Sequence, residues 1–290
     1  MEECRFSRLI AGTMTWGAWG KQLNKNQMND LIHHCISQNI TTFDHADIYG
    51  GYSTEAEFGN AFAESGVERT TVQIISKCGI QLIDTKRKTE VKHYNYNKSY
   101  ITWSVEQSLK KLKTDYLDLL LLHRPSPLME PEDIAEAITE LIDCGKIKSF
   151  GVSNFTVSQM ELLLTYLDVS ANQIECSLTA PKALNDGTLD YLCLNNMTTM
   201  AWSPLGDLYK KETKQTVRIH NVLNGLCEKY QTSKNQLLLA WLLKHPANLY
   251  PVLGTTTPDR ITKSAEALQI HLDLQDWFKM WEASLGNEVP

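Results

Sequence analysis

Short apolar runs alternate with amphipathic segments along the whole chain, and this alternation is the strongest constraint on its fold. Several runs are apolar at consecutive positions, as in YLDLLLLH at 116–123, which is typical of parallel strands buried on both faces. Eight such runs, each followed by a helical pattern, predict a closed parallel (β/α)8 barrel, the TIM-barrel architecture, rather than an open sheet. The expected strands are 8–12, 41–44, 72–77, 117–123, 149–152, 171–175, 198–202 and 250–253.

The segments between these strands carry helix signals. Residues 26–38 place their apolar side chains on one stripe. Ser53 is read as an N-cap, Pro131 as the first turn of a helix that Gly145 ends, and Ser233 as the cap of the apolar QLLLAWLL helix. No linker rich in Pro, Gly or Ser divides the chain, so residues 1–290 are predicted to form a single domain.

Three stretches are longer than simple connections need: 80–98, 206–217 and the tail after His271. The first two follow the third and seventh expected strands. In a parallel barrel those loops lie at the C-terminal face, where ligands bind and where we therefore expect the active site.

Composition narrows the class of protein. The chain is 42% apolar and 21% charged with a net charge of −6, which favours a soluble globular protein and argues against nucleic-acid binding. No apolar run approaches membrane-spanning length, and the opening MEECRFSRLIAG lacks the apolar core of a secretory signal, so we expect a cytoplasmic protein without a membrane partner. The seven cysteines are scattered without CxxC spacing, which predicts reduced thiols and no metal site.

Ionisable side chains stand at the ends of three consecutive expected strands. They are Asp44, Lys77 and His123, and Tyr49 follows Asp44 by five residues in a segment that contains two glycines. Each one alone is equally consistent with a charge at the barrel rim or a satisfied core histidine. Together they predict a proton-handling site at the mouth of the barrel.

The chemistry of these four groups is specific. A tyrosine has a pKa near 10, and a nearby ammonium from Lys77 would lower it toward neutrality. Asp44 would keep Lys77 charged and aimed, and His123 could donate a hydrogen bond to a carbonyl oxygen. Such a group protonates an oxygen while a hydride reaches the neighbouring carbon. The four residues by themselves do not indicate that a hydride is transferred.

The chain resembles the aldo-keto reductase superfamily over nearly its whole length. The matching stretches are LIAGTMTWG, FDHADIYGG, IISKCG, LDLLLLHRP, GKIKSFGVSNF, NQIEC, AWSPLG and VLGTTTPDR. HADIYGGY and LGNEVP further resemble a bacterial subgroup of small cytosolic oxidoreductases. The resemblance implies that Asp44, Tyr49, Lys77 and His123 are a catalytic tetrad, with Tyr49 as the proton donor in NADPH-dependent reduction of an aldehyde or ketone.

The resemblance also implies which residues bind the cofactor, and the absence of a GxGxxG turn is consistent with it. Ser153, Asn154 and Gln173 match residues that hold the nicotinamide carboxamide, and Trp202 matches the aromatic side chain that stacks on the ring. Arg260 matches an arginine that engages the 2′-phosphate, whereas Gly254 replaces a lysine found in many members, so NADPH is expected over NADH mainly because of Arg260, with Lys263 a possible helper. The remaining assigned contacts are Thr13, Met14, Ser203, Leu205, Gly206, Thr255 and Thr257.

The substrate pocket is less defined by sequence. Trp16 is expected to wall it, beside Tyr49 and His123, while Asp47 and Arg124 are either pocket residues or a salt bridge at the rim. A small carbonyl compound is the expected substrate, and its identity and the oligomeric state stay open, with a monomer plausible. The alternative function is a cofactor-binding redox sensor or regulatory subunit with the same fold.

Overall fold

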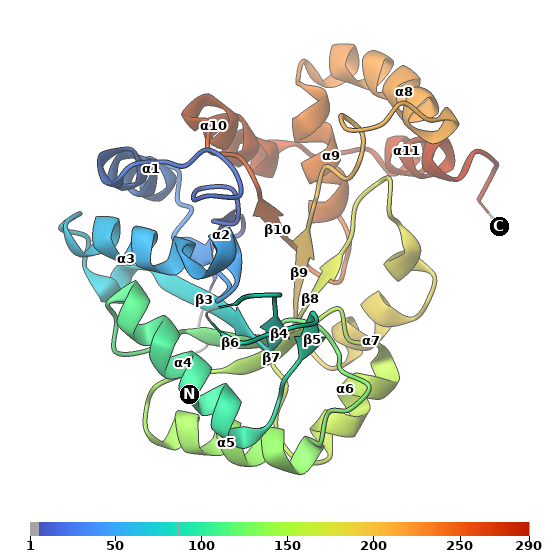
Figure 1. Cartoon of the computed structure of the whole chain (residues 1–290). Coiled ribbons are helices and arrows are strands. Elements are labelled where there is room, and N and C mark those ends of the chain that lie inside the picture. The colour runs from blue at the N-terminus through green and yellow to red at the C-terminus, as the bar shows by residue number, and fades with distance from the viewer. Residues whose placement is uncertain (1–5, 86, 290) are drawn as a thin grey trace.

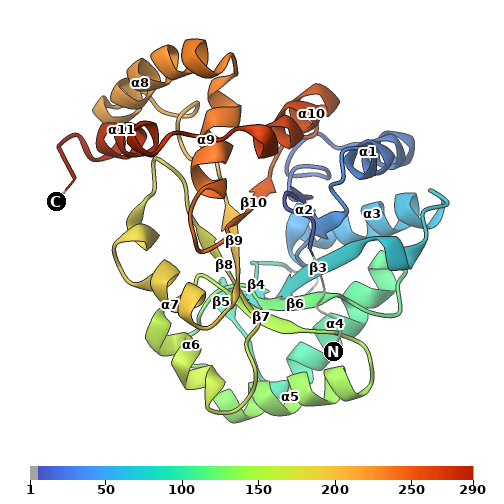
Figure 2. The same ribbon diagram turned by 180° about the vertical axis from the view of Figure 1, so that it is seen from behind.

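In the computed structural model, which describes residues 6–85 and 87–289, eight parallel strands close into a barrel with helices around it (Figures 1 and 2). Their order around the barrel is β1-β10-β9-β8-β7-β6-β3-β2, and the pairing of Ile10 with Val252 closes it. This confirms the predicted (β/α)8 architecture. The strands are β1 (Ile10–Gly12), β2 (Thr42–Asp44), β3 (Gln73–Cys78), β6 (Leu119–Leu122), β7 (Phe150–Ser153), β8 (Ala171–Glu175), β9 (Thr198–Trp202) and β10 (Tyr250–Leu253).

The consecutive leucines of β6 serve two cores. Leu119 and Leu121 pack in one cluster with Ile10, Ile75 and other strand residues, whereas Leu120 and Leu122 belong to the large cluster shared with the helices. Because successive side chains of a strand point to opposite faces, the first cluster fills the barrel and the second joins it to the surrounding helices. This is why the run is apolar throughout.

The helices begin largely where the sequence signals them. The side chains of Asn97 and Thr156 accept hydrogen bonds from backbone N–H groups at two helix starts, and Pro131 occupies the first turn of a third. Ser53 is an exception, because its hydroxyl donates to the carbonyl of Gly50 and caps no helix. The helices are α1 (Lys25–Ser37), α2 (Tyr49–Tyr52), α3 (Thr54–Ala63), α4 (Lys98–Leu112), α5 (Pro131–Asp143), α6 (Val157–Leu164), α7 (Thr188–Leu194), α8 (Lys214–Tyr230), α9 (Lys234–Leu243), α10 (Pro258–Glu266) and α11 (Leu274–Leu285).

The three long stretches have different structures. The first forms a small antiparallel sheet of β4 (Ile80–Gln81) and β5 (His93–Tyr94), which lies over one end of the barrel (Figure 1). The second makes a turn and then leads into α8. The tail forms α11, which packs against α8 outside the barrel, where Arg218 donates a hydrogen bond of 3.0 Å to the carbonyl of Ala283.

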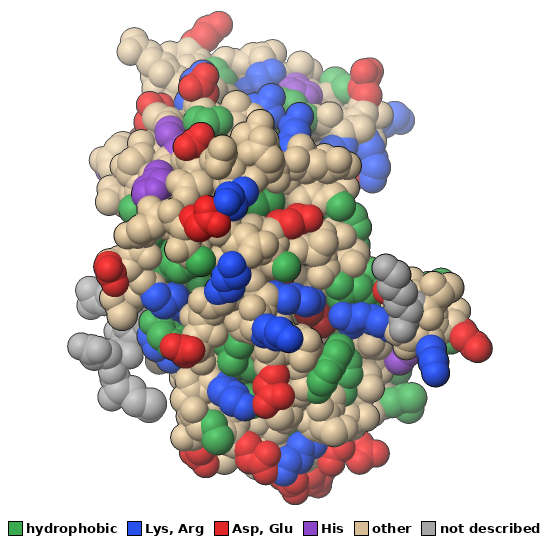
Figure 3. Space-filling model, turned by 60° about the vertical axis from the view of Figure 1, so that its left-hand side comes forward, with side chains coloured by type: hydrophobic (Ala, Val, Ile, Leu, Met, Phe, Trp, Pro, Cys, Tyr) green, Lys and Arg blue, Asp and Glu red, His purple; other side chains and the backbone are tan. Residues whose placement is uncertain are grey.

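The cysteines, helix lengths, possible metal ligands and surface charges of the described residues bear on the expectations from composition. The six cysteines within the described residues are free thiols, and Cys4 lies outside them. No described helix is long and apolar enough to span a bilayer, and no described group of three or more His, Cys, Asp or Glu could hold a metal ion. On the face in Figure 3, basic side chains lie among acidic ones, and acidic side chains gather at the bottom over α5, where Lys98 pairs with Glu136 and Glu140.

Candidate active site

A cavity of about 580 Å³ opens at the end of the barrel where the strands finish. Asp44, Ser153, Trp202 and Leu253 end four of the strands and line it, and His123 directly follows a fifth. Its lining therefore identifies the mouth as the C-terminal face of the barrel. From above, β4, β5 and the residues next to them add Ile80, Leu82, Lys92 and Tyr94 to the wall.

Lys77 connects three of the four residues predicted to act together. Its Nζ lies 2.8 and 2.7 Å from the two carboxylate oxygens of Asp44, 2.8 Å from the carbonyl oxygen of His45 and 3.2 Å from the hydroxyl of Tyr49. Lys77 and Asp44 are only 1% and 2% exposed. A buried ion pair survives when additional hydrogen bonds satisfy its remaining donors and acceptors, and both partners meet that condition here.

The charge distribution keeps Lys77 as an ammonium and Tyr49 as a phenol. Burial disfavours the charged lysine, but the pairing with Asp44 outweighs it and raises the pKa of Lys77 above its usual value. Burial also raises the pKa of Tyr49, and the opposing effect of Lys77 is the smaller one. Lys77 thus acts in the expected direction, but desolvation of the phenolate outweighs it and the net shift of the Tyr49 pKa is upward.

His123 completes the group from the neighbouring strand end. Its ring centroid lies 6.0 Å from that of Tyr49 in an edge-on arrangement. Burial and the nearby Lys77 lower the pKa of His123 well below its usual value, so the imidazole is neutral. Its Nδ1 is buried without a hydrogen-bond partner among the described residues, which leaves Nε2 as the nitrogen available to a ligand.

Two glycines set the position of Tyr49. Gly50 and Gly51 adopt φ of +63° and +66°, a region that other residues rarely occupy, so the chain turns sharply after the tyrosine. A side chain on Gly50 would also meet the hydroxyl of Thr54 at 2.5 Å. The turn holds the phenol 8% exposed at the cavity wall and above Lys77.

Hydrogen bonds link several of the residues assigned to the cofactor with one another and with the ion pair. Trp202 donates its indole N–H to the amide oxygen of Asn154 at 2.9 Å, and Gln173 donates its amide to Asp44 at 3.0 Å. Asn154 has a positive φ of 61°, and backbone strain of this kind is often found at binding sites. The assigned residues that line the cavity are Met14, Ser153, Asn154, Gln173, Trp202, Ser203 and Gly254.

Other assigned residues lie elsewhere. Trp16 is fully buried against Phe43 and Phe58, so the assignment of this residue to the substrate wall is wrong. Thr13 is also buried, and its hydroxyl donates to the carbonyl of Asp44 rather than facing the cavity. Both residues lie in the loop after β1, where Thr13 is fixed by β2 and Trp16 by β2 and α3, and their sequence position does not reveal these contacts.

The residues assigned to the cofactor in the segment after β9 also differ in whether they line the cavity. Leu205 packs against both large apolar clusters and does not line the cavity. Gly206 adopts φ of +58° where the chain passes close to Thr179, and a side chain there would meet that hydroxyl at 1.9 Å. Gly206 is thus explained by close packing, and only Ser203 of this trio reaches the cavity.

The residues assigned to the adenosine phosphate surround the start of α10, at the edge of the mouth. Thr257 precedes the helix, the hydroxyl of Thr255 accepts from the Thr257 N–H at 3.2 Å, and Arg260 is exposed in the first turn. Free backbone N–H groups at a helix start attract anions. These residues lie outside the cavity lining but continue from Gly254, which is part of it.

Sequence reasoning missed Trp19. This side chain lines the cavity, with its ring centroid 6.1 Å from that of Tyr49, and occupies the place expected for Trp16. A signal existed in the sequence, because Trp19 stands between Gly17 and Gly20 in a loop. The structure leaves its side chain 45% exposed.

Asp47 and Arg124 do not form the rim salt bridge that was one of the two alternatives. Arg124 lines the cavity. Asp47 is instead buried, and one of its carboxylate oxygens accepts hydrogen bonds from Tyr100 at 3.3 Å and Ser104 at 3.2 Å. Its other oxygen has no hydrogen-bond partner among the described residues.

We expect Asp47 to make stability pH-dependent. Burial and nearby Glu55 raise the pKa of Asp47 from 3.8 to about 7. Between those values the folded state holds a proton that the unfolded state has released, so the free energy of unfolding falls as pH rises from about 4 to about 7, by roughly 4 kcal/mol in total. Asp47→Asn should remove this slope in denaturant titrations at pH 5 and 7. The exposed Asp143→Asn should keep it, and identical slopes in all three proteins would contradict the assignment.

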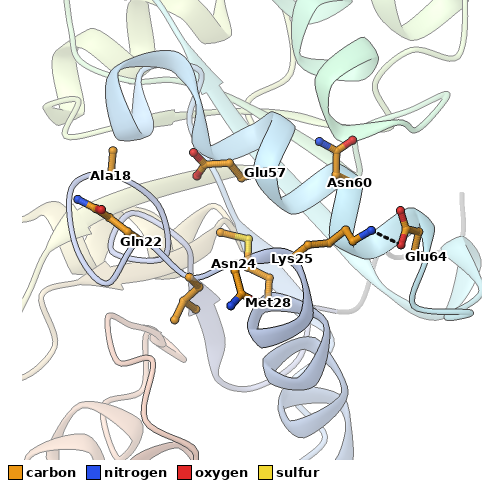
Figure 4. A pocket seen from close by; sticks show the side chains of 9 residues that line it. Ala18, Gln22, Asn24, Lys25, Met28, Glu57, Asn60 and Glu64 are labelled. Atoms are coloured by element: carbon orange, nitrogen blue, oxygen red, sulfur yellow. Dashed lines mark ion pairs between the residues drawn. The ribbon is translucent and has the colours of Figure 1, made fainter.

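A second hollow, of about 620 Å³, lies on the outside of the barrel between α1 and α3. Figure 4 shows polar side chains around it, including Gln22, Asn60 and the ion pair between Lys25 and Glu64 at 2.6 Å. None of the four predicted catalytic residues lines it. The mouth cavity is therefore the candidate active site.

Comparison with known proteins places the chain in a family. The model of the Aldo/keto reductase family matches residues 8–284. The chain is 41% identical to the uncharacterized oxidoreductase YcsN of Bacillus subtilis, over 100% of this chain and 98% of that protein. It is 39% identical to the 6-dehydroglucose reductase of Agrobacterium fabrum, over 89% and 88%.

A solved structure agrees with the sequence comparisons. The thermostable aldo-keto reductase Tm1743, solved with the inhibitor epalrestat, superimposes with a TM-score of 0.81 at 25% identity, covering 97% of each chain. A family match over nearly the whole length, with relatives of this identity and coverage, shows that the chain belongs to the aldo/keto reductase family of oxidoreductases.

Proposed function

We propose that this protein reduces an aldehyde or ketone to an alcohol with NADPH, and that Tyr49 is the proton donor. The observation that carries the proposal is the buried Lys77, which contacts both Asp44 and the hydroxyl of Tyr49 beside a neutral His123. Membership of a family that generally uses nicotinamide cofactors supports it.

Each side chain has a role that follows from its state. Tyr49 is protonated and can give its proton to the carbonyl oxygen, after which the ammonium of Lys77, 3.2 Å away, stabilises the phenolate. Asp44 keeps Lys77 charged and oriented. His123 donates an N–H to the same carbonyl oxygen and aims the carbonyl at Tyr49.

The residues at the mouth fit a nicotinamide cofactor. When bound, the cofactor supplies a hydride to the carbonyl carbon. Ser153, Asn154 and Gln173 present amide and hydroxyl groups around one point of the cavity, where they would hold a carboxamide. Trp202 is kept in position by its hydrogen bond to Asn154 and would offer a face for the ring.

We expect Arg260 to decide cofactor preference. Its exposed guanidinium at the start of α10 can pair with a 2′-phosphate, with Lys263 on the same helix as a helper. Arg260→Gln should reduce kcat/KM with NADPH by at least about tenfold, since a hydrogen bond to a charged group contributes about 1.5–3 kcal/mol. Activity of the same variant with NADH is the internal control. Comparable kcat/KM for the two cofactors in the unmodified protein would refute the preference.

A screen of NADPH oxidation with small aldehydes, ketones, quinones and sugars tests the function. Sugar aldehydes are included because one relative is named a 6-dehydroglucose reductase. Turnover of at least one carbonyl supports the proposal. Tight NADPH binding without turnover of any compound would favour the redox sensor or regulatory subunit.

The free thiols of the described cysteines support a cytoplasmic location.

A further inference from the structure

Two cationic side chains line the cavity without an acidic partner. Arg124 follows His123 at the end of β6, and Lys92 comes from the loop that leads into β5. Neither makes an ion pair with any other described residue. The one carboxylate among the described residues of the lining, Asp44, is fully engaged with Lys77.

The net charge of the cavity lining is therefore positive, whereas that of the whole protein is negative. The lining carries the positive charges of Lys92 and Arg124, and the carboxylate of Asp44 is neutralised by the buried Lys77, whereas the whole chain carries a net charge of −6. A recess with low-dielectric walls and one sign of charge attracts and concentrates ligands of the other sign. An excess of positive charge confined to the mouth of an acidic protein indicates an anionic ligand.

Arg124 is held where such a ligand would meet it. The hydroxyl of Tyr96 donates to the Arg124 carbonyl oxygen at 2.5 Å and accepts from its N–H at 3.1 Å. The guanidinium carbon lies 5.5 Å from the centre of the Trp202 ring. These contacts anchor the residue at both its backbone and its side chain.

Both cations act on the atoms that would hold the carbonyl. Lys92 and Arg124 contribute, after burial and Lys77, to lowering the pKa of His123, and Arg124 also opposes the rise in the pKa of Tyr49. Their electrostatic reach thus includes the proposed proton donor and the proposed orienting histidine. If a substrate carbonyl lies between Tyr49 and His123, a charged group a few bonds away from that carbonyl is also close enough to interact with Lys92 and Arg124.

The phosphates of a cofactor do not account for these cations. The residues that would bind them surround the start of α10, directly after β10. In the barrel β10 and β6 are separated by β9, β8 and β7, so Arg124 stands on the opposite side of the mouth. Arg124 and Lys92 are therefore expected to bind an anionic group other than the cofactor phosphates.

We propose that the mouth selects carbonyl substrates that carry a carboxylate, with Arg124 and Lys92 binding the anionic group while the carbonyl lies between Tyr49 and His123. The planar guanidinium of Arg124 matches a carboxylate in two parallel hydrogen bonds, and Lys92 adds a mobile charge from the loop above. The inference rests on the proposed carbonyl reduction and names the substrate class of that same site.

The test compares 4-oxobutanoate with its uncharged methyl ester at saturating NADPH. We expect the acid to have the higher kcat/KM by at least about tenfold, which is the usual contribution of a charge-assisted hydrogen bond. Arg124→Gln should reduce this ratio to within about threefold of unity, and Lys92→Gln should reduce it in part. Lys88→Gln removes the same charge from the same loop but does not line the cavity, and should keep the ratio.

The outcomes separate the two proposals. If the unmodified protein reduces both compounds equally, prefers the ester, or reduces other carbonyls but neither of these, the carboxylate site is overturned while carbonyl reduction stands. Loss of the ratio in Lys88→Gln as well would overturn it too, because then only overall charge matters. No turnover of any carbonyl refutes the proposed function and this inference with it. Thermal unfolding checks that Arg124→Gln is folded. If Arg124→Gln does not fold, the ratio is measured with Lys92→Gln instead, because Lys92 is exposed.

Discussion

The Tyr49→Phe variant should reduce a test aldehyde with a kcat/KM lower by about 10²–10⁴-fold, the usual contribution of a positioned general acid. The substitution removes one oxygen atom and therefore the proposed proton donor. Lys77 keeps its contacts with both oxygens of Asp44 and with the carbonyl of His45, so the buried ammonium stays satisfied. Steady-state kinetics measure the loss, and fluorescence titration should show NADPH binding within about threefold of the unmodified protein, since no contact to Trp202 or Asn154 changes.

A matched control is available at Tyr166. Its hydroxyl donates to Glu132 at 2.7 Å on the outside of the barrel, and Tyr166→Phe removes the same atom far from the mouth. That variant should reduce the aldehyde at the normal rate. If Tyr49→Phe keeps activity within about tenfold of the unmodified protein, Tyr49 is not the proton donor.

The Lys77→Met variant should lose both activity and stability. Removing the ammonium leaves the carboxylate of Asp44, 2% exposed, with the amide of Gln173 as its remaining side-chain donor among the described residues. An uncompensated buried charge costs about 3–5 kcal/mol of folding free energy. Denaturant unfolding at pH 7 measures the loss.

The double variant Asp44→Asn, Lys77→Met separates the two effects. With neither charge present, most of the lost stability should return, because the cost in the single variant comes from the Asp44 carboxylate that is left buried without a counter-charge. Activity should not return. Equal stability of the single and double variants would contradict a buried, coupled pair. Lys98→Met, in an exposed ion pair on α4, is the control and should unfold almost as the unmodified protein does.

Much of the barrel could be predicted because its signals are local. Strands 171–175, 198–202 and 250–253 have the predicted bounds, and each of the remaining strands differs by one or two residues at one or both ends. An unbroken apolar run such as that of β6 fits only a strand covered on both faces. The assignment of the whole chain to one domain stays a prediction.

The grouping of the site could be predicted for a similar reason. Asp44 is the last residue of β2, Lys77 is the last but one of β3, and His123 directly follows β6. All parallel strands of a barrel end at one face. Once the architecture is known, residues at those positions must converge. The motif around each residue then distinguishes a site from an ordinary rim.

Side-chain direction and the balance of charge could not be predicted in this way. Trp16 and Trp19 stand in the same short loop, and only the packing of Phe43 and Phe58 decides that the first is buried and the second faces the cavity. The sign of the Tyr49 shift depends on how completely the barrel excludes water from the phenol, which is a sum over many distant residues.

The sequence by itself determined the barrel and, through its resemblance, the family, and it predicted the group of Asp44, Tyr49, Lys77 and His123, because strand patterns and strand-end residues are recorded position by position along the chain. The tertiary structure alone decided which tryptophan lines the mouth, that Asp47 is buried away from it, and that Lys92 and Arg124 stand there without acidic partners among the described residues. These features depend on desolvation and on distances between segments far apart in the chain, and both exist only after the barrel has closed.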